Sequence, residues 1–384
     1  YALGHFAVGS MEVFLPQILT RLQETATNEV ASSKHTYLLL SSVKEVVRTH
    51  QLNGIDLAPS LPLMLPQLFL FLSSKEDGIR SMVAECLGSM ICIQPLTVLP
   101  KLQELTQTHT TKEVGNNEEQ PLQREEDARA CWTIATAVKF AISKHSSVSE
   151  LKGYMPSFLV LLRDGGNDLT TEKDIDLKER EVSVRNAALL MVYAAVHHQP
   201  LLLADLMTEH VLPFLYKLAL LKLPRVVDLG PFKQRVDDAL PLRKASLSIF
   251  AASLEKCPSS IDIPALMPIL ATSLSDKDED VQLHAHRIVL FLCSKYPKCL
   301  VLPGVVESFC DPLEKRMTIT SKEKNMTGTE LERLNEWIKS ALRVMISLNK
   351  VEGVRSCKRF AKFHDTIKSH TKFQSMLGAL EEEH

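Results

Sequence analysis

The sequence predicts an all-α protein, an α-solenoid of stacked helix pairs with one small β-hairpin inserted. The first observation is composition: leucine is abundant, whereas only 14 glycines and 6% aromatic residues occur among 384 residues. This balance favours helices over a sheet sandwich. The other two observations are short motifs that recur along the chain, one containing proline and one beginning with acidic residues. Together they predict a repeated helical unit.

The first recurrent motif is an apolar residue, a proline, one or two further residues and then an apolar run. Proline is tolerated in the first turn of a helix, because the N–H group at that position has no partner within the helix. We therefore expect each proline to mark the start of the first helix of a pair. The prolines are Pro16, Pro66, Pro100, Pro156, Pro213 and Pro268, which lie 50, 34, 56, 57 and 55 residues apart.

The second motif begins with acidic residues and continues with apolar residues every three or four positions, the period of an amphipathic helix. Acidic side chains interact favourably with the positive end of a helix dipole, so they suit its first turn. We expect this motif to form the second helix of each pair. Clear copies are Lys75–Gly88, Glu179–Val196 and Asp278–Cys293, and looser copies are Glu125–Ile142 and Asp237–Leu254.

A helix pair recurring at this spacing is typical of HEAT repeats, whose length is about 40–47 residues. We expect about seven pairs, which stack because one pair cannot bury its apolar face alone. The chain begins without methionine, and we interpret residues 1–8 as the remnant of a preceding pair in a longer protein. Residues 1–350 are predicted to form the solenoid, and residues 351–384 a C-terminal helical cap with an acidic tail.

Three insertions interrupt the predicted array. Residues 108–127 and 163–181 are polar and poor in apolar residues, as expected of solvated loops. Residues 225–238 differ, because Val226 and Val227 favour a strand and Gly230-Pro231 breaks it, so a β-hairpin is predicted.

Two interpretations of this hairpin remain open at the level of sequence. An isolated two-stranded hairpin is marginal in water, so it must pack on the solenoid as a lid or dock into a partner. Its predicted tip, Leu229 to Phe232, carries two large apolar side chains. A rim of charged side chains surrounds that tip, a composition typical of a binding hot spot. The rim residues are Arg225, Asp228, Lys233 and Arg235.

No pattern in the sequence predicts catalysis, a metal site or a cofactor. We find no glycine-rich phosphate loop, no GxSxG motif and no HExxH motif. The eight cysteines include no CxxC pair, which suggests reduced thiols in the cytosol or nucleus. A formal net charge of −2 gives no reason to expect a nucleic-acid or membrane partner. We therefore expect a protein that is not an enzyme.

The C-terminal stretch Cys357–Phe373 is locally basic, and phenylalanines lie between its lysines. One interpretation is an amphipathic helix that packs its aromatic face on the last repeat. The other is a basic contact patch for an acidic partner.

Several segments resemble the C-terminal part of the cullin-associated, neddylation-dissociated proteins. The most specific of them is LGPFKQRVDDALPLRKA, from Leu229 to Ala245. The resemblance follows the same order along the chain and covers nearly all of it. The other segments are Tyr1–Gly9, Lys34–Val46, Val83–Gly88, Thr136–His145 and Val211–Tyr216.

The resemblance implies a long eukaryotic HEAT solenoid that regulates cullin–RING ubiquitin ligases without catalysing a reaction. It implies that this part binds the N-terminal region of an unmodified cullin, in the cytoplasm and nucleus. A hairpin there would compete with the adaptor and so promote exchange of substrate receptors. The implied partner-binding residues are Val226, Val227, Asp228, Leu229, Gly230, Pro231, Phe232, Lys233, Gln234 and Arg235. The alternative is an importin-β-like nuclear transport receptor or another HEAT-repeat scaffold. The sequence of the hairpin argues against a transport receptor.

Overall fold

The structure is a computed structural model that divides into two units, and each is described by itself. Unit 1 comprises Tyr1–Phe214 and Lys222–Ala245, and unit 2 comprises Leu215–Leu221 and Ser246–His384. The predicted fold class is confirmed, because both units consist of helix pairs and two strands form a small antiparallel sheet. The structure describes residues 2–27, 33–50, 56–111, 121–144, 149–163, 175–228, 230, 232–317 and 328–382.

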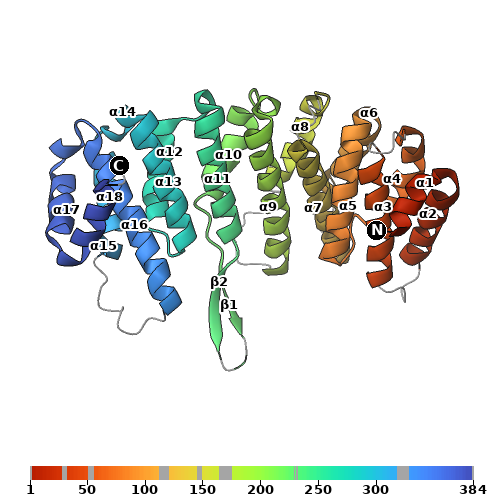
Figure 1. Ribbon diagram of the computed structural model, residues 1–384, viewed down its shortest axis with the longest axis horizontal. Coiled ribbons are helices and arrows are strands. Elements are labelled where there is room, and N and C mark those ends of the chain that lie inside the picture. The colour runs from red at the N-terminus through yellow and green to blue at the C-terminus, as the bar shows by residue number, and fades with distance from the viewer. Residues whose placement is uncertain are drawn as a thin grey trace. The chain divides into compact units, whose positions relative to one another are not determined.

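Unit 1 arranges its helices in two layers (Figure 1). In one layer α1, α3, α5, α7 and α9 contact each other in that order, and in the other α2 contacts α4 and α6 contacts α8. Each helix thus buries its apolar face against the next pair. The helices are α1 Ala2–Gly9, α2 Met11–Thr27, α3 Ser33–Thr49, α4 Leu61–Phe69, α5 Asp77–Ile93, α6 Pro95–Thr111, α7 Pro121–Ser143, α8 Leu151–Leu159 and α9 Ile175–His198.

Unit 2 repeats this arrangement: α12 contacts α15, which contacts α17, while α13 contacts α16, which contacts α18. Helices α10 (Leu212–Leu218) and α11 (Leu240–Lys256) each contribute residues to both units. The remaining helices are α12 Ile263–Leu274, α13 Glu279–Lys295, α14 Pro297–Leu300, α15 Val305–Met317, α16 Gly328–Lys350, α17 Lys358–Ser369 and α18 Thr371–Glu382.

The C-terminal basic stretch forms α17, and its apolar side chains Phe360, Phe363 and Ile367 are fully buried. This burial agrees with the interpretation of an amphipathic helix that packs its aromatic face inward. The division into residues 1–350 and 351–384 stays a prediction, and the side chains of Glu381 to His384 lie outside the described residues.

The prediction that the recurrent prolines begin helices is wrong for five of the six. Each of these five is the sixth residue of its helix. Pro213 is the second residue of α10, which directly follows a π-helix at Met207–Val211. A proline at the sixth position removes one hydrogen bond to the carbonyl four residues earlier. The apolar residues around the proline define the buried face of the helix rather than its start. The five prolines are Pro16, Pro66, Pro100, Pro156 and Pro268.

Both polar insertions are shorter than predicted. Helix α6 continues to Thr111 and α7 begins at Pro121, so both ends of the 108–127 segment are helical. The His109 imidazole contacts the Asp127 carboxylate across this insertion, and Gln123 Nε2 donates to the same carboxylate at 3.3 Å. Helix α9 likewise begins at Ile175. Residues 112–120 and 164–174 lie outside the described residues.

Close packing between α5 and α7 depends on Gly88. A Cβ atom at this position would lie 2.6 Å from Phe140 Cβ and 2.7 Å from the Ala137 carbonyl oxygen. Both distances are too short for real carbon contacts, so the two helices approach this closely only because Gly88 has no side chain.

A buried histidine lies between α13 and α16 in unit 2. His286 Nδ1 lies 3.0 Å from Ser340 Oγ, and its ring lies 5.3 Å from the Trp337 ring. Burial, and secondarily the charge of Arg316, lowers the pKa of His286 to about 3. The folded protein therefore keeps His286 neutral.

We predict that Gly88→Ala lowers the free energy of unfolding of unit 1 by about 1–3 kcal/mol, because the methyl group overpacks the α5–α7 contact. The matched control is Gly153→Ala in α8, where nothing lies within 4 Å of the added methyl group. The control should raise the free energy of unfolding by up to about 1 kcal/mol, since alanine favours helix. Urea unfolding of both variants measures this, and effects of the same sign would contradict the packing argument.

We also predict that His286 makes unit 2 less stable in acid. Its folded pKa is depressed, so between about pH 6.5 and pH 3 the unfolded chain binds a proton that the folded chain does not. The free energy of unfolding therefore falls as the pH drops through this window. In His286→Asn the slope of the free energy of unfolding against pH should decrease in this window by up to about 1.4 kcal/mol per pH unit. Equal slopes in chemical unfolding of the two proteins between these pH values would contradict the prediction.

Candidate protein-binding hairpin

The predicted hairpin is present and belongs to unit 1. Strand β1 (Pro224–Asp228) pairs antiparallel with β2 (Lys233–Asp237). In this register Val226 lies opposite Arg235, and Val227 lies opposite Gln234. Figure 1 shows the two strands extending past the end of α9.

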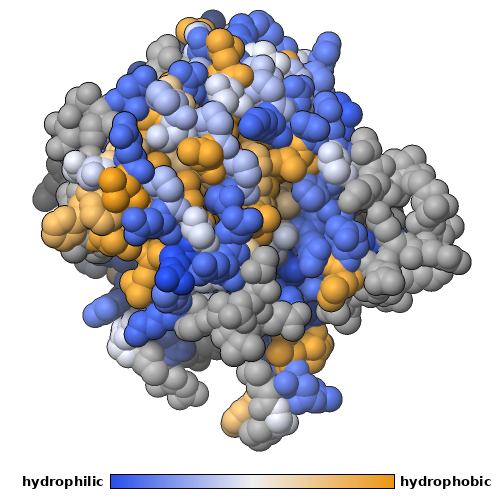
Figure 2. All heavy atoms as spheres, turned by 90° about the vertical axis from the view of Figure 1, so that its right-hand side faces the viewer, coloured by the Kyte–Doolittle hydropathy of each residue, from blue (hydrophilic) through white to orange (hydrophobic). Residues whose placement is uncertain are grey.

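The hairpin is exposed rather than folded over a core. None of the strand residues is buried, and Val226 is 58% exposed. Phe232 at the tip is 74% exposed, a high value for a large apolar side chain. Figure 2 shows hydrophobic and hydrophilic residues side by side on this projecting part. The lid interpretation therefore does not hold for the described residues, while the predicted tip residues Leu229 and Pro231 lie outside them.

The two faces of the hairpin differ. Successive residues of a strand point to opposite faces, and paired residues share a face. Val227 and Val236 thus share a half-buried face. The opposite face carries the exposed residues Val226, Asp228, Lys233 and Arg235. The exposed face therefore combines an apolar side chain with two cations and one carboxylate.

Gly230, between the two strands, makes a local hydrogen bond. The Asp228 side chain accepts a hydrogen bond of 3.0 Å from the Gly230 backbone N–H. Gly230 has a φ of +82°, a left-handed conformation that glycine adopts without steric cost. The chain can therefore reverse between the two strands and present Phe232 directly after the turn.

The base of the hairpin is fixed by two aspartates. Asp237 Oδ1 accepts hydrogen bonds from the backbone N–H groups of Leu223 at 2.8 Å and Ala239 at 3.2 Å. Asp237 Oδ2 lies 2.8 Å from Nη1 of Arg243, whose side chain is only 3% exposed. Asp238 forms a second ion pair, at 2.7 Å, with Nε of Arg225 on β1. One carboxylate thus joins both ends of the hairpin to helix α11.

A donor at the same helix position closes the turn of two other pairs, which have no hairpin, by binding a backbone carbonyl group. In unit 1, Arg80 Nη1 donates to the Ser74 carbonyl oxygen at 2.6 Å. In unit 2, Gln282 Nε2 donates to the Asp276 carbonyl oxygen. In each case the donor is a buried side chain near the start of the second helix, and its acceptor lies six residues earlier, as Asp237 does before Arg243. The hairpin is therefore an expanded turn, held by the donor position that closes ordinary turns.

The sequence-based prediction did not include Asp237, Asp238 and Arg243 among the site residues. No recurrent sequence motif marks them, because Arg80 and Gln282 donate to backbone carbonyl groups, and the residue six positions before Arg80 is a serine. Their importance becomes apparent only once the hairpin base is seen to join α11.

The exposed residues of the hairpin are of the kind found at contacts between proteins. Within the described ranges no group of three His, Cys, Asp or Glu side chains could hold a metal ion. None of the helices that the structure describes is long and apolar enough to cross a membrane. The exposed residues of the hairpin instead offer apolar side chains flanked by charges, which is typical of binding surfaces.

These features define a class: a HEAT-type helical repeat protein that carries a hairpin in the turn of one pair. Residues 203–368, which include the hairpin and its base, match the TIP120 family model, described as TATA-binding protein interacting (TIP20). The cullin-associated NEDD8-dissociated protein 1 of Arabidopsis thaliana is 31% identical over 94% of this chain and 26% of its own length. The Dictyostelium discoideum protein of the same name is 30% identical over 98% of this chain and 28% of its own length.

A third relative is the "Cullin-associated NEDD8-dissociated protein 1, C-terminal part" of Emericella nidulans, 26% identical over 91% of this chain and 30% of its own length. The chain belongs to the family of the cullin-associated NEDD8-dissociated proteins, and it spans 26–30% of the length of these relatives. Among solved structures, importin beta has a TM-score of 0.49 and 11% identity over 99% of this chain and 44% of that chain. At that score the likeness supports no conclusion.

We predict that Asp237→Ala loosens the hairpin base. It should lower the free energy of unfolding by about 1–3 kcal/mol, since hydrogen bonds to a charged group contribute about this much. Hydrogen exchange of the strand amides should also become faster. The matched control is Arg235→Ala, an exposed charge on the same hairpin, which should change neither quantity. Strand amides that remain as protected in Asp237→Ala as in the unchanged protein would contradict this role.

Proposed function

We propose that this chain is a non-catalytic regulator of cullin–RING ubiquitin ligases that binds the N-terminal region of an unmodified cullin. The family match supports association with a cullin, because the relatives are named cullin-associated proteins. The observation that carries the proposal is the exposed side chain of Phe232 on a hairpin with an anchored base.

The anchored base matters because binding normally costs the entropy of ordering loops. The carboxylate of Asp237 already joins the hairpin to α11 before any partner arrives. Phe232 and Val226 can therefore be buried in a partner at a small ordering cost. Exposed aromatic side chains presented in this way are the usual anchors of protein interfaces.

The proposed mechanism is competition between the hairpin and the adaptor that carries the substrate receptor. If a cullin binds this chain and an adaptor together for a short time, each weakens the other by the same coupling free energy. Overlap at the hairpin would supply that coupling, and the adaptor would leave faster than it does unaided. The proposal requires no bond to be made or broken. Localisation in the cytoplasm and nucleus stays a prediction.

The first test is calorimetric titration of this chain with the isolated N-terminal domain of a cullin, with and without saturating adaptor. We expect binding, and we expect the adaptor to weaken it. Binding of equal strength with and without adaptor would contradict the competition. Absence of binding at about 100 μM, which corresponds to less than roughly 5.5 kcal/mol, would contradict the proposed partner.

The hairpin is tested separately with Phe232→Ala. Because Phe232 is 74% exposed, this variant should unfold like the unchanged chain. We expect its affinity for the cullin domain to fall about tenfold or more, as at a binding hot spot. The matched control is Phe6→Ala in α1, which removes a phenylalanine that is 68% exposed away from the hairpin. Equal affinities of the two variants would contradict a role for the tip.

A further inference from the structure

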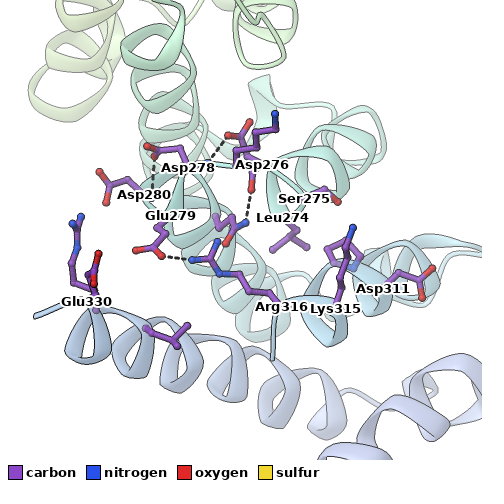
Figure 3. A pocket seen from close by; sticks show the side chains of 15 residues that line it. Leu274, Ser275, Asp276, Asp278, Glu279, Asp280, Asp311, Lys315, Arg316 and Glu330 are labelled. Carbon is purple, nitrogen blue, oxygen red and sulfur yellow. Dashed lines mark hydrogen bonds and ion pairs between the residues drawn. The ribbon is translucent and has the colours of Figure 1, made fainter. Parts of the chain in front are cut away.

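We infer that a pocket in unit 2 receives an arginine side chain from a partner protein. The pocket lies at a turn where Gln282 occupies the helix position that Arg80 occupies in the α4–α5 pair. The pocket has a volume of about 840 Å³ and lies where the turn between α12 and α13 meets α15 and α16. Figure 3 shows Asp276 and Asp278 at this turn, with Arg316 and Glu330 facing them from the other two helices. The inference does not depend on the hairpin.

Gln282 forms part of the pocket wall and leaves one polar atom without a partner. Gln282 is only 4% exposed, and its Nε2 donates a hydrogen bond to the Asp276 carbonyl oxygen. Its Oε1 is buried and has no hydrogen-bond partner in the part of the chain that the structure describes. A buried acceptor without a donor costs about 1–3 kcal/mol. This oxygen atom of Gln282 therefore lacks a hydrogen-bond donor.

The helix pair of α4 and α5 shows what fills this place elsewhere. Arg80 occupies the position of Gln282 and donates both to Ser74 O at 2.6 Å and to Lys75 O at 3.1 Å. The same guanidinium also pairs with Asp77, three residues earlier. Gln282 is shorter and donates to one carbonyl only. A guanidinium supplied from outside would bring the donors that this chain's own side chain lacks.

The charges of the wall also favour a cation. Six carboxylates and four cationic side chains line the pocket, and one of the carboxylates, Asp311, pairs with Arg359 from outside it, which leaves a difference of −1. The carboxylate three residues before Gln282, Glu279, pairs with Arg316 of α15. The guanidinium of Arg316 also lies 4.8 Å from the centre of the Trp337 ring. This part of the fold thus already binds one guanidinium through a carboxylate and an aromatic face.

Arginine fits this environment better than the alternatives. An anion would bring no donor to Gln282 Oε1 and would meet the surplus of carboxylates. A lysine would bring a point charge, whereas arginine brings five N–H donors in a planar fork that can contact an amide oxygen and a carboxylate together. The expected ligand is therefore an arginine in an exposed segment of a partner protein.

The test uses short capped peptides as probes and this chain as the receptor. The first peptide contains one arginine between glycines, the second has citrulline in its place, and the third has lysine. We expect the arginine peptide to bind with a dissociation constant in the millimolar range and to shift the NMR signal of the Gln282 side-chain amide. The citrulline and lysine peptides should bind at least about tenfold more weakly.

The variant Gln282→Arg should lose peptide binding while remaining folded, so it distinguishes loss of the binding site from unfolding. The new arginine should fill the pocket, abolish binding of the arginine peptide and raise the melting temperature. The matched control is Glu352→Gln, which removes an exposed carboxylate outside this pocket and should leave binding unchanged. The inference is overturned if the arginine peptide does not bind at about 20 mM, or if citrulline or lysine binds equally well. Unchanged binding by Gln282→Arg would overturn it as well.

Discussion

In the α4–α5 and α12–α13 pairs, the turn is closed by one buried side-chain donor near the start of the second helix. Arg80 performs this task for Ser74, and Gln282 performs it for Asp276. Buried carbonyl groups need such partners, because leaving one unsatisfied costs about 1–3 kcal/mol. The donor fixes where the second helix begins relative to the first, and this in turn fixes which apolar residues face the next pair. At Arg243 the same donor position binds the Asp237 carboxylate and so anchors an extended hairpin in place of a short turn.

The fold class could be predicted from the sequence, because the composition and the apolar periodicity that indicate it are present along the whole chain. The positions of helix starts did not follow, and the prolines show why. Proline favours the first turn, yet Pro66 is the sixth residue of α4, where Met64 and Leu65 beside it are fully buried. Burial of those neighbours outweighs the lost hydrogen bond of the proline. A local preference cannot reveal this, since the gain comes from residues distant in sequence.

The strands of the hairpin could be predicted because β-branched residues flank a glycine–proline break. Their anchor could not, because the Asp237–Arg243 pair forms only when α11 begins where it does. The pocket beside Gln282 was also invisible to sequence reasoning. Glutamine in a helix is ordinary, and its significance appears only by comparison with Arg80 in another pair and from the unpartnered oxygen in the structure.

The two ends of the hairpin meet at a single carboxylate, since Asp237 accepts the N–H groups of Leu223 and Ala239. The hairpin is therefore joined to helix α11 at a closed junction. Residues between Leu223 and Asp237 can be added, removed or exchanged over evolutionary time without moving α11, provided that the junction is kept. The hairpin is in this sense a replaceable module, and the same junction is a natural point at which to graft a different recognition loop onto the array.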